Sequence, residues 1–300
     1  MNKKLIKKSI IVIFLIIILI ISGYFINRYL IPKVDTKTEE ITTKTVEKSE
    51  ITDNTYKSEE LEINIEKIEK GEDKDKVTYY IADIKLKKPE RLKRGFAHDQ
   101  IGYNIVESMT TITTRKNSIL AINGDYYGFR KTGIVIGNSK IYRNNPTREA
   151  LAIYNDGTMK IFDENKADAE QLIKDGVINT LSFGPVLVRN KKAEADYEYF
   201  NVDPDNVIRG NIVPENPRTG IGYYDKNHYC FIVVDGRKEG YSKGVTLKEF
   251  AMIFENLGCE FAYNLDGGNS SNMYFMNKKI NKSSQPGDGE RPISDILYIY

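Results

Sequence analysis

The first apolar run of the chain has the length of a membrane-spanning helix. Residues 10–21 are unbroken Ile, Val, Phe and Leu, and a weaker apolar stretch continues to Ile26. A helix needs about 20 apolar residues to cross a bilayer, whereas a cleaved signal peptide has an apolar core of about 7–15 residues and then a cleavage site of small residues. Asn27 and Arg28 follow here instead. The pattern favours an uncleaved anchor over residues 9–31, with a cleaved signal peptide as the alternative.

Basic residues flank this run unequally. Lys3, Lys4, Lys7 and Lys8 precede it, and only Arg28 follows closely. The flank richer in Lys and Arg generally stays in the cytoplasm. The sequence therefore predicts a single-pass protein of the cell membrane, with residues 1–8 as a cytoplasmic basic tail, the lipid bilayer around residues 9–31, and the rest of the chain extracellular.

A polar segment separates this anchor from the remaining apolar runs. Residues 32–59 are mostly Thr, Lys, Glu and Asp, with few large apolar side chains. Such a composition cannot bury enough apolar surface to offset the entropy lost on ordering. We expect a disordered stalk over residues 32–59 and one domain over residues 60–300.

Short apolar runs dominate this outer domain. They are rich in Val, Ile, Tyr and Phe, and Gly, Asn, Asp and Pro separate them, as is typical of β-strands. The expected strands cover residues 77–86, 118–122, 134–136, 150–154, 177–183, 220–224, 229–234, 261–265, 272–275 and 293–300. The sequence predicts the α+β class: a β-rich domain with few helices and a mixed or mainly antiparallel sheet.

Three segments have helical patterns. The clearest follows Thr246, which forms a capping box with Glu249; apolar residues recur on one face, and Gly258 ends the helix. Weaker patterns predict helices over residues 105–114 and 167–174.

The capped helix lies between two apolar strands with a carboxylate after each. Asp235 follows the first strand and Asp266 the second. If the two strands lie side by side in parallel, the helix is a βαβ crossover and both carboxylates emerge at one edge of the sheet. Ligand groups commonly gather at such edges.

Charge and cysteine content restrict the choice of function. The net charge is +2, but five of the 44 basic residues flank the anchor, which leaves 39 against 42 acidic residues. No basic patch indicates nucleic acid as a partner. Cys230 and Cys259 lie in apolar runs, so a disulfide and two buried thiols both remain open. The abundance of Ile, Lys and Asn without any Trp is typical of low-GC Gram-positive bacteria.

The chain has two histidines, His98 and His228, and both lie in loop-like segments. A Ser-His-Asp triad built on Ser270 or Ser271 would need one of them nearby. The sequence therefore disfavours such a triad, and it disfavours a histidine-based zinc site for the same reason.

Carboxylates and arginines are better candidates for chemistry. Three aspartates follow apolar runs beside glycine, and three arginines precede such runs. They are Asp125, Asp235 and Asp266, and Arg148, Arg218 and Arg291. Taken singly, each Asp-Gly is also a turn signal and each Arg a surface ion-pair partner.

Six motifs taken in order resemble the phosphodiester glycosidase family. They are AINGDYYGF, SFGPVLV, NPRTGIGYY, FIVVDGR with the capped helix after it, NLDGGNSSNMYF and GERPISDILYIY, and they cover residues 119–300. The resemblance implies hydrolysis of the glycosidic bond of a sugar 1-phosphodiester, which releases a free sugar and a phosphomonoester. Anchorage outside a membrane by a stalk suits an enzyme of this kind that acts on a glycan or sugar-phosphate polymer of the cell wall or surface exopolysaccharide.

The resemblance also implies a set of site residues. It points to Asn123, Asp125, Arg148, Arg218, Asp235, Asp266, Gly267, Gly268, Ser270 and Ser271. The family's usual run is Asp-Gly-Gly-Gly-Ser-Ser, and here Asn269 stands at the third glycine. Because Asn tolerates positive φ better than other side chains do, the backbone can survive this change, but the side chain occupies space that a glycine leaves open.

The proposed chemistry suits these residue types. Arginines grip phosphate oxygens in pairs of hydrogen bonds, a role we assign to Arg148, Arg218 and Arg291. On the sugar side, a carboxylate must stabilise an oxocarbenium-like centre, attack it as a nucleophile, or activate a water molecule. Asp266 is the first candidate for this role and Asp235 the second. The backbone amides from Gly267 to Ser271 are expected to form a phosphate-binding nest.

Two alternatives remain open at this point. A surface protein that binds glycan or phosphate polymers without cleaving them would keep the arginines. A metal-dependent phosphodiesterase would hold a hard cation through Asp125, Asp235 and Asp266. The sequence requires no cofactor, and a divalent cation is compatible with it.

Overall fold

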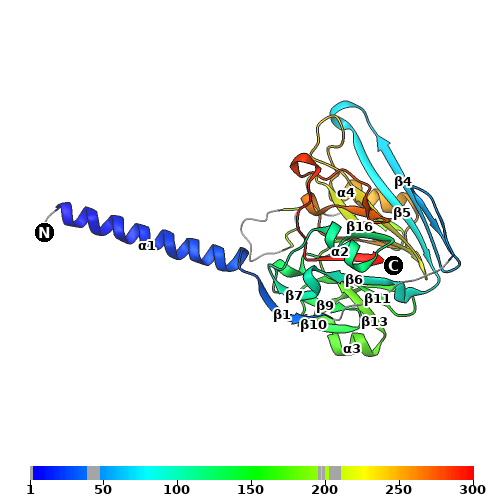
Figure 1. Cartoon of the computed structure of the whole chain (residues 1–300), viewed down its shortest axis with the longest axis horizontal. Helices are drawn as coiled ribbons and strands as arrows, with labels where there is room; N and C mark the ends of the chain where they lie inside the picture. The colour runs from blue at the N-terminus through cyan, green and yellow to red at the C-terminus, as the bar shows by residue number, and fades with distance from the viewer. Residues whose placement is uncertain (1–2, 39–47, 195–196, 198–199, 203–210) are drawn as a thin grey trace.

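The computed structural model describes residues 3–38, 48–194, 197, 200–202 and 211–300. Figure 1 shows α1 (Lys3–Tyr29) as a single helix that projects away from a domain containing the other elements. Its apolar side chains from Ile10 to Ile26 are exposed, so the described domain does not cover them. By length and composition, Ile10–Tyr29 is able to cross a membrane.

Three further α-helices and seven 3₁₀ turns accompany the strands in the described residues. The helices are α2 (Met109–Lys116), α3 (Ala169–Lys174) and α4 (Leu247–Asn256), and the 3₁₀ turns are η1 (Asp73–Asp75), η2 (Pro89–Arg91), η3 (Ala97–Asp99), η4 (Tyr127–Phe129), η5 (Glu164–Lys166), η6 (Gly268–Ser270) and η7 (Pro286–Asp288). The strands are β1 (Lys33–Lys37), β2 (Glu50–Ile51), β3 (Thr55–Lys57), β4 (Leu61–Lys70), β5 (Val77–Leu86), β6 (Leu92–Phe96), β7 (Gln100–Tyr103), β8 (Leu120–Asn123), β9 (Gly133–Gly137), β10 (Lys140–Asn145), β11 (Glu149–Tyr154), β12 (Met159–Asp163), β13 (Val177–Leu181), β14 (Val186–Arg189), β15 (Lys192–Ala193), β16 (Arg218–Asp225), β17 (His228–Val234), β18 (Phe261–Asn264), β19 (Met273–Phe275), β20 (Lys278–Lys279) and β21 (Asp295–Ile299).

Two large sheets organise the domain. The larger has nine strands in the order β15-β14-β18-β16-β17-β5-β4-β3-β2, and the smaller has five in the order β20-β19-β8-β21-β6. A three-stranded sheet (β12-β11-β13) and two strand pairs (β1-β7 and β10-β9) complete the described strands. Each of these neighbouring strands runs antiparallel to the next. The predicted α+β class, rich in strands with few helices, is confirmed.

The nine-stranded sheet has a core on each face. Along β5 and β17, Ile81 and Ile232 pack with the apolar side of α4 on one face. Their neighbours Ala82 and Phe231 belong to the core shared with the five-stranded sheet on the other face. Alternate side chains of a strand point to opposite faces, so two apolar faces produce the unbroken apolar runs seen in the sequence.

Helix α4 begins as the sequence predicts. The Thr246 hydroxyl accepts a hydrogen bond from the Glu249 amide at 3.2 Å, and the Glu249 carboxylate accepts one from the Thr246 amide at 2.8 Å. These two bonds satisfy donors that the first turn of a helix leaves free. Helices α2 and α3 form near the two weaker patterns, with boundaries shifted by a few residues.

The two strands on either side of α4 are not neighbours, in contrast to the βαβ expectation. β16 lies between β17 and β18 and runs antiparallel to both. The outer two therefore point the same way, and Asp235 and Asp266 still emerge at one edge of the sheet. Arg218, the first residue of β16, lies opposite Val234 at this edge.

The segment expected to be a disordered stalk contains paired strands. β1 pairs with β7, and β2 and β3 extend the nine-stranded sheet beside β4. Backbone hydrogen bonds hold these strands while their mostly polar side chains stay in water, so composition alone did not reveal them. Residues 39–47 of the expected stalk lie outside the described residues.

Cys230 and Cys259 are both buried thiols in the core beneath α4. Their sulfur atoms lie 3.7 Å apart. Of the two possibilities left open by the sequence, the structure has the pair of buried thiols.

Candidate functional site

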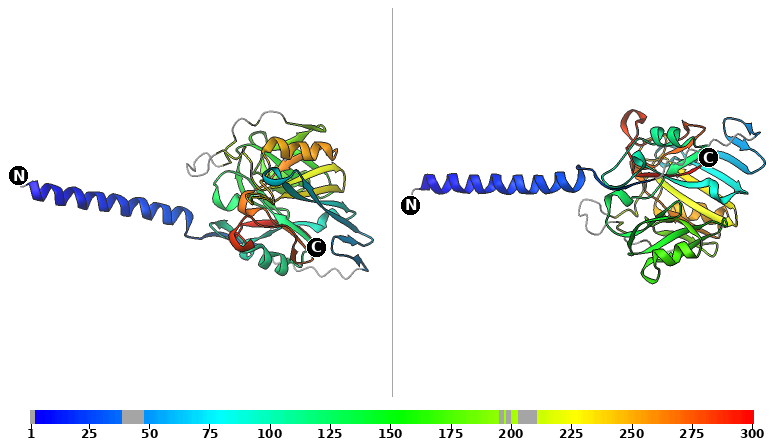
Figure 2. Two further views of the ribbon diagram at one scale, coloured as in Figure 1. Left: turned by 90° about the horizontal axis from the view of Figure 1, so that it is seen from above. Right: turned by 60° about the horizontal axis from the view of Figure 1, so that its bottom comes forward.

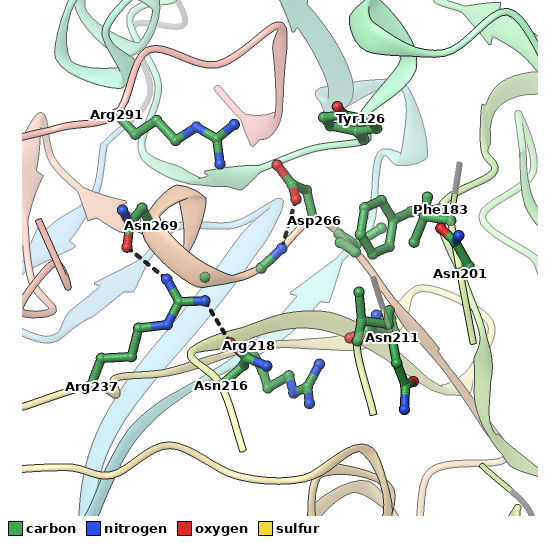
Figure 3. A pocket seen from close by; sticks show the side chains of 16 residues that line it. Tyr126, Phe183, Asn201, Asn211, Asn216, Arg218, Arg237, Asp266, Asn269 and Arg291 are labelled. Carbon is green, nitrogen blue, oxygen red and sulfur yellow. Dashed lines mark hydrogen bonds between the residues drawn. The ribbon is translucent and has the colours of Figure 1, made fainter. Parts of the chain in front are cut away.

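One cavity of about 260 Å³ collects several of the expected residues at the edge where β16 and β18 meet their connecting loops. Its described lining comprises Tyr126, Phe183, Asn201, Val202, Asn211, Ile212, Asn216, Arg218, Arg237, Asn264, Leu265, Asp266, Gly267, Gly268, Asn269 and Arg291. Figure 3 shows polar side chains on most sides and the rings of Tyr126 and Phe183 on another.

Asn123 joins the two large sheets directly behind this cavity. Its side-chain amide donates to the backbone oxygen of Asp266 at 2.6 Å. Its side-chain oxygen accepts from the Thr219 hydroxyl at 2.7 Å and from the Asn272 amide at 3.2 Å. Asn123 ends β8 of the five-stranded sheet and Thr219 lies in β16 of the other. Asn123 therefore holds the backbone at Asp266 and does not line the cavity itself.

Asp266 is the one carboxylate among the described lining residues. Its Oδ1 accepts from the Gly267 amide at 3.0 Å, and no cationic side chain of the described chain pairs with it. The residue is half-buried. Figure 3 places its carboxylate between Arg291 and Tyr126. Asp266 therefore gives the cavity a half-buried carboxylate that has no cationic partner among the described residues.

Arg218 lies in the wall, where backbone oxygens hold its guanidinium. It donates to the carbonyls of Val245, at 3.0 Å, and of Val213 and Pro214. Burial, and secondarily the nearby charge of Arg237, lower the pKa of Arg218 to about 10, so it stays protonated at neutral pH. No carboxylate of the described residues neutralises it.

Arg237 is a second cation of the cavity, and the sequence analysis missed it. It has a left-handed backbone, with φ of 58°, directly after the Asp-Gly at the end of β17. Its guanidinium donates to the side-chain oxygens of Asn269, at 3.0 Å, and Asn216, at 2.6 Å. Burial and then the charge of Arg291 lower its pKa. Cationic residues that lower one another's pKa form a favourable site for an anion.

Arg291 supplies the third cation of the cavity lining. Figure 3 shows Arg237 and Arg291 on opposite sides of the loop that carries Gly267 and Asn269. With Arg218, these cations outnumber the lining carboxylate three to one among the described residues. The cavity therefore combines an excess of positive charge with a carboxylate at its edge.

The glycine-rich loop differs from both expectations made for it. The positive φ, 61°, lies at Gly268 and not at Asn269, whose side chain binds Arg237 and accepts from the Ser284 hydroxyl at 2.6 Å. The amides of Gly267, Gly268, Ser270 and Ser271 donate within the protein, to Asp266, Pro217, Gly267 and Gly268 respectively. These four amides therefore do not form the free phosphate-binding nest that the sequence predicted.

Ser270 and Ser271 are buried next to this loop. Their hydroxyls have no hydrogen-bond partner among the described residues. Neither lines the main cavity; Ser270 lines a second cavity of about 10 Å³ that also touches Asp266 and Arg291. That volume is about the size of one water molecule.

Asp125 was predicted to be catalytic, but its carboxylate is fully used inside the protein. It pairs with both terminal nitrogens of Arg130, at 2.6 and 2.8 Å, and accepts from the Ser182 amide at 2.8 Å. Burial is the largest single effect and opposes its ionisation, but the charge and hydrogen bonds of Arg130, the charge of Arg94 and the Ser182 amide together outweigh it and lower the pKa to about 2. Asp125 does not line the main cavity, and its role in the structure is a buried ion pair.

Asp235 is likewise held away from the cavity. Its Oδ1 accepts from the Asn281 side chain at 2.8 Å, and its Oδ2 accepts from the Tyr241 hydroxyl at 2.8 Å and the Lys282 amide at 3.1 Å. Burial raises its pKa against the effect of these bonds. Asp235 therefore fixes the segment after β20, and Asp266 alone of the three expected carboxylates faces the main cavity.

Arg148 does not line the main cavity but lies behind two residues that do. It donates to the backbone oxygens of Phe183 at 3.2 Å and Val202 at 2.6 Å, two residues that line the cavity. It therefore supports the aromatic side of the site, in contrast to its expected contact with phosphate.

A hard cation would need several carboxylates in one place. Asp125 and Asp266 both touch the small second cavity, but Arg130 pairs with Asp125, and the described residues contain no group of three His, Cys, Asp or Glu side chains that could hold a metal. Among these residues, the metal-dependent phosphodiesterase hypothesis therefore has no ligand set of that kind.

Comparison with known proteins agrees with this architecture. A family model described as phosphodiester glycosidase matches residues 116–300. A SPbeta prophage-derived uncharacterized protein of Bacillus subtilis (strain 168), YomE, is 29% identical over 90% of the chain, which spans only 43% of that relative.

Two solved structures share the fold. The catalytic domain of zebrafish N-acetylglucosamine-1-phosphodiester alpha-N-acetylglucosaminidase, described as auto-inhibited by its pro-peptide, has a TM-score of 0.62 and 19% identity, with 88% of this chain and 87% of that chain covered. A hypothetical protein from Synechocystis has a TM-score of 0.58 and 12% identity, with 81% and 62% covered. Because the family model matches more than half of the chain, the chain belongs to the phosphodiester glycosidase family.

Proposed function

We propose that the protein is a membrane-anchored extracellular hydrolase that cleaves the glycosidic bond of a sugar 1-phosphodiester. The observation that supports this most strongly is the grouping of Arg218, Arg237 and Arg291 with the accessible carboxylate of Asp266 in one cavity. The cations suit a phosphate, and the five asparagines of the lining suit the hydroxyl groups of a sugar.

One carboxylate is enough for this reaction. Glycosidases that release an alcohol use a second carboxyl group to protonate the leaving oxygen. A phosphomonoester leaves as a stable anion, and arginines that contact its oxygens stabilise the charge that develops on it. We therefore assign leaving-group stabilisation to the three arginines and the sugar side of the reaction to Asp266.

Asp266 either activates a water molecule or attacks the anomeric carbon directly. Both roles need an ionised carboxylate in a fixed position. The Asn123 side chain and the Gly124 carbonyl, which accepts from the Asp266 amide at 3.4 Å, hold its backbone. Asn123 is thus proposed as a positioning residue.

The anchor belongs to the same proposal. α1 places Lys3, Lys4, Lys7 and Lys8 at one end and the domain at the other. With the basic end in the cytoplasm, the cavity is outside the cell, where cell-wall and surface polymers are the available substrates.

Hydrolysis in water enriched in oxygen-18 tests the reaction type. The full-length protein in detergent is incubated with a panel of sugar 1-phosphodiesters that includes UDP-N-acetylglucosamine. Cleavage of the glycosidic bond puts the label on the free sugar, whereas attack at phosphorus puts it on a phosphate and would refute the proposal. Asp266→Asn is expected to abolish turnover, and Asp156→Asn, a surface carboxylate, is the matched control. Binding without turnover would favour a glycan-binding protein.

A further inference from the structure

The end of α1 is joined to the domain by direct contacts. The Asn104 side chain donates to the backbone oxygens of Arg28 and Ile31, each at 3.0 Å. The last carbonyls of a helix have no partner within the helix, so Asn104 completes the helix end from the domain side.

Strand β1 strengthens this junction. Only three residues separate α1 from β1, and β1 pairs with β7. One more backbone hydrogen bond follows this pairing, from the Thr38 amide to the Asp99 carbonyl oxygen at 2.8 Å. At Gly102 in β7, a Cβ atom would lie 1.9 Å from the Lys33 carbonyl oxygen. Glycine at this position is what allows the two backbones to approach. Figures 1 and 2 show the short connection from α1 into the domain in three views.

The cavity lies close to the same junction along two paths. The Asn104 amide donates to Gly128 at 3.0 Å, two residues from the cavity residue Tyr126. Glu107 and Ile293 exchange backbone bonds of 3.0 and 2.9 Å, two residues from the cavity residue Arg291. With about 3.8 Å between successive Cα atoms, the first path places the cavity within roughly 20 Å of the end of α1, and the second within roughly 30 Å.

We infer that the substrate is a sugar 1-phosphodiester whose aglycone is attached to the membrane that holds α1. This inference rests on the anchor and the activity proposed above. A flexible stalk over residues 32–59 would have a root-mean-square length of about 30 Å and would let the domain sample distant polymers. The Asn104 and β1 junction removes that freedom and keeps the cavity beside the bilayer surface.

The height of the cavity above the bilayer is measurable because the chain contains no tryptophan. A single tryptophan is placed at Lys131, an exposed residue three positions after Gly128, or at Lys57, an exposed residue of β3. β3 lies at the side of the domain remote from α1 in Figures 1 and 2. In vesicles with a dansyl-labelled lipid, Lys131→Trp is expected to transfer energy to the lipid much more efficiently than Lys57→Trp. Equal transfer from both would overturn the inference.

Turnover in vesicles tests the substrate class. A lipid-linked sugar 1-phosphodiester is supplied in the same vesicles as the full-length protein or in separate vesicles, and UDP-N-acetylglucosamine is supplied in solution. We expect the same-vesicle substrate to be cleaved about tenfold faster than the separate-vesicle one. A 15-residue Gly-Ser insertion after Ile31 should lower the same-vesicle rate and leave the soluble rate unchanged. The same insertion between β1 and β2 is the control, because it follows the junction.

The outcomes separate this inference from the proposed function. Cleavage of the soluble substrate with equal rates for same and separate vesicles would overturn the membrane-attached substrate and leave the glycosidase activity standing. A same-vesicle rate unaffected by the insertion after Ile31 would show that the junction does not matter, and would also overturn the inference. No cleavage of any substrate would refute the proposed function and this inference with it.

Discussion

Replacing Asp125 by Asn should destabilise the protein, although the sequence motif suggests a catalytic role. The change removes the negative charge from a pair in which Arg130 has no exposed side-chain surface. A buried charge left without its partner destabilises by about 3–5 kcal/mol. The pKa of Asp125, lowered to about 2, gives an independent figure of roughly 2.5 kcal/mol relative to its usual value. We therefore expect a loss of about 3 kcal/mol at pH 7.

Thermal unfolding followed by circular dichroism measures this loss. For a domain of this size, 3 kcal/mol corresponds to a decrease in Tm of about 10 °C. Asp156→Asn, which breaks an exposed pair with Lys226, should change Tm by at most 1–2 °C, since surface pairs contribute about 0–1 kcal/mol. Because the folded-state pKa of Asp125 is depressed, its contribution is complete above about pH 4 and disappears as the pH falls towards 2.

A double variant separates the ion pair from other causes. Asp125→Asn with Arg130→Met removes both charges, and such replacements are often close to neutral. The double variant should therefore be more stable than Asp125→Asn alone. Two results would contradict a stabilising ion pair between Asp125 and Arg130. One is an Asp125→Asn variant that keeps the parental Tm. The other is a double variant whose loss of unfolding free energy equals the sum of the losses in the two single variants.

Three further changes have definite expectations. Arg237→Gln should raise the inhibition constant of inorganic phosphate about tenfold, because the variant loses one charge-assisted hydrogen bond to the phosphate. Arg189→Gln, in a surface ion-pair cluster, is the control and should leave this constant unchanged. Thr246→Ala removes the capping box of α4 and should lower the free energy of unfolding by about 1 kcal/mol in urea titrations, and an unchanged midpoint would contradict the cap assignment. Burial raises the pKa of the Cys230 thiol, so alkylation at pH 8 should be slow in the folded protein and fast in denaturant; rapid labelling of the folded protein would show that the core beneath α4 opens.

The sequence predicted those elements whose signals are local. The capping box of α4 involves residues three apart, and β5 occupies the whole apolar run over residues 77–86. Strands β1 to β3 were missed because backbone pairing holds them and their composition is largely polar; β1 pairs with the distant β7, whereas β2 and β3 pair with the strands that follow them. The neighbour order β17-β16-β18 was missed because no local pattern indicates that β16 lies between the strands on either side of α4.

The site shows the same division between local and distant information. Asp125, Asp235 and Asp266 have similar local surroundings, an apolar strand before them and glycine beside them. Their roles differ because Arg130 neutralises the first and Asn281 and Tyr241 bind the second. The VVDGR motif contained Arg237, but its contacts with Asn216 and Asn269 depend on loops brought together only by the fold.

The support around Asp266 explains why this carboxylate is suited to chemistry and the other two are not. Asn123 and Gly124 hold its backbone, while its side chain binds only the adjacent Gly267 amide among the described residues. An ion-paired carboxylate such as Asp125 would have to lose its partner before it could attack or activate water. Asp266 needs no such rearrangement. A substrate phosphate bound by Arg218, Arg237 and Arg291 would neutralise the charge of these arginines and would place the sugar beside the Asp266 carboxylate. In the proposed reaction the site therefore needs little reorganisation, which is the condition for strong electrostatic stabilisation of a transition state.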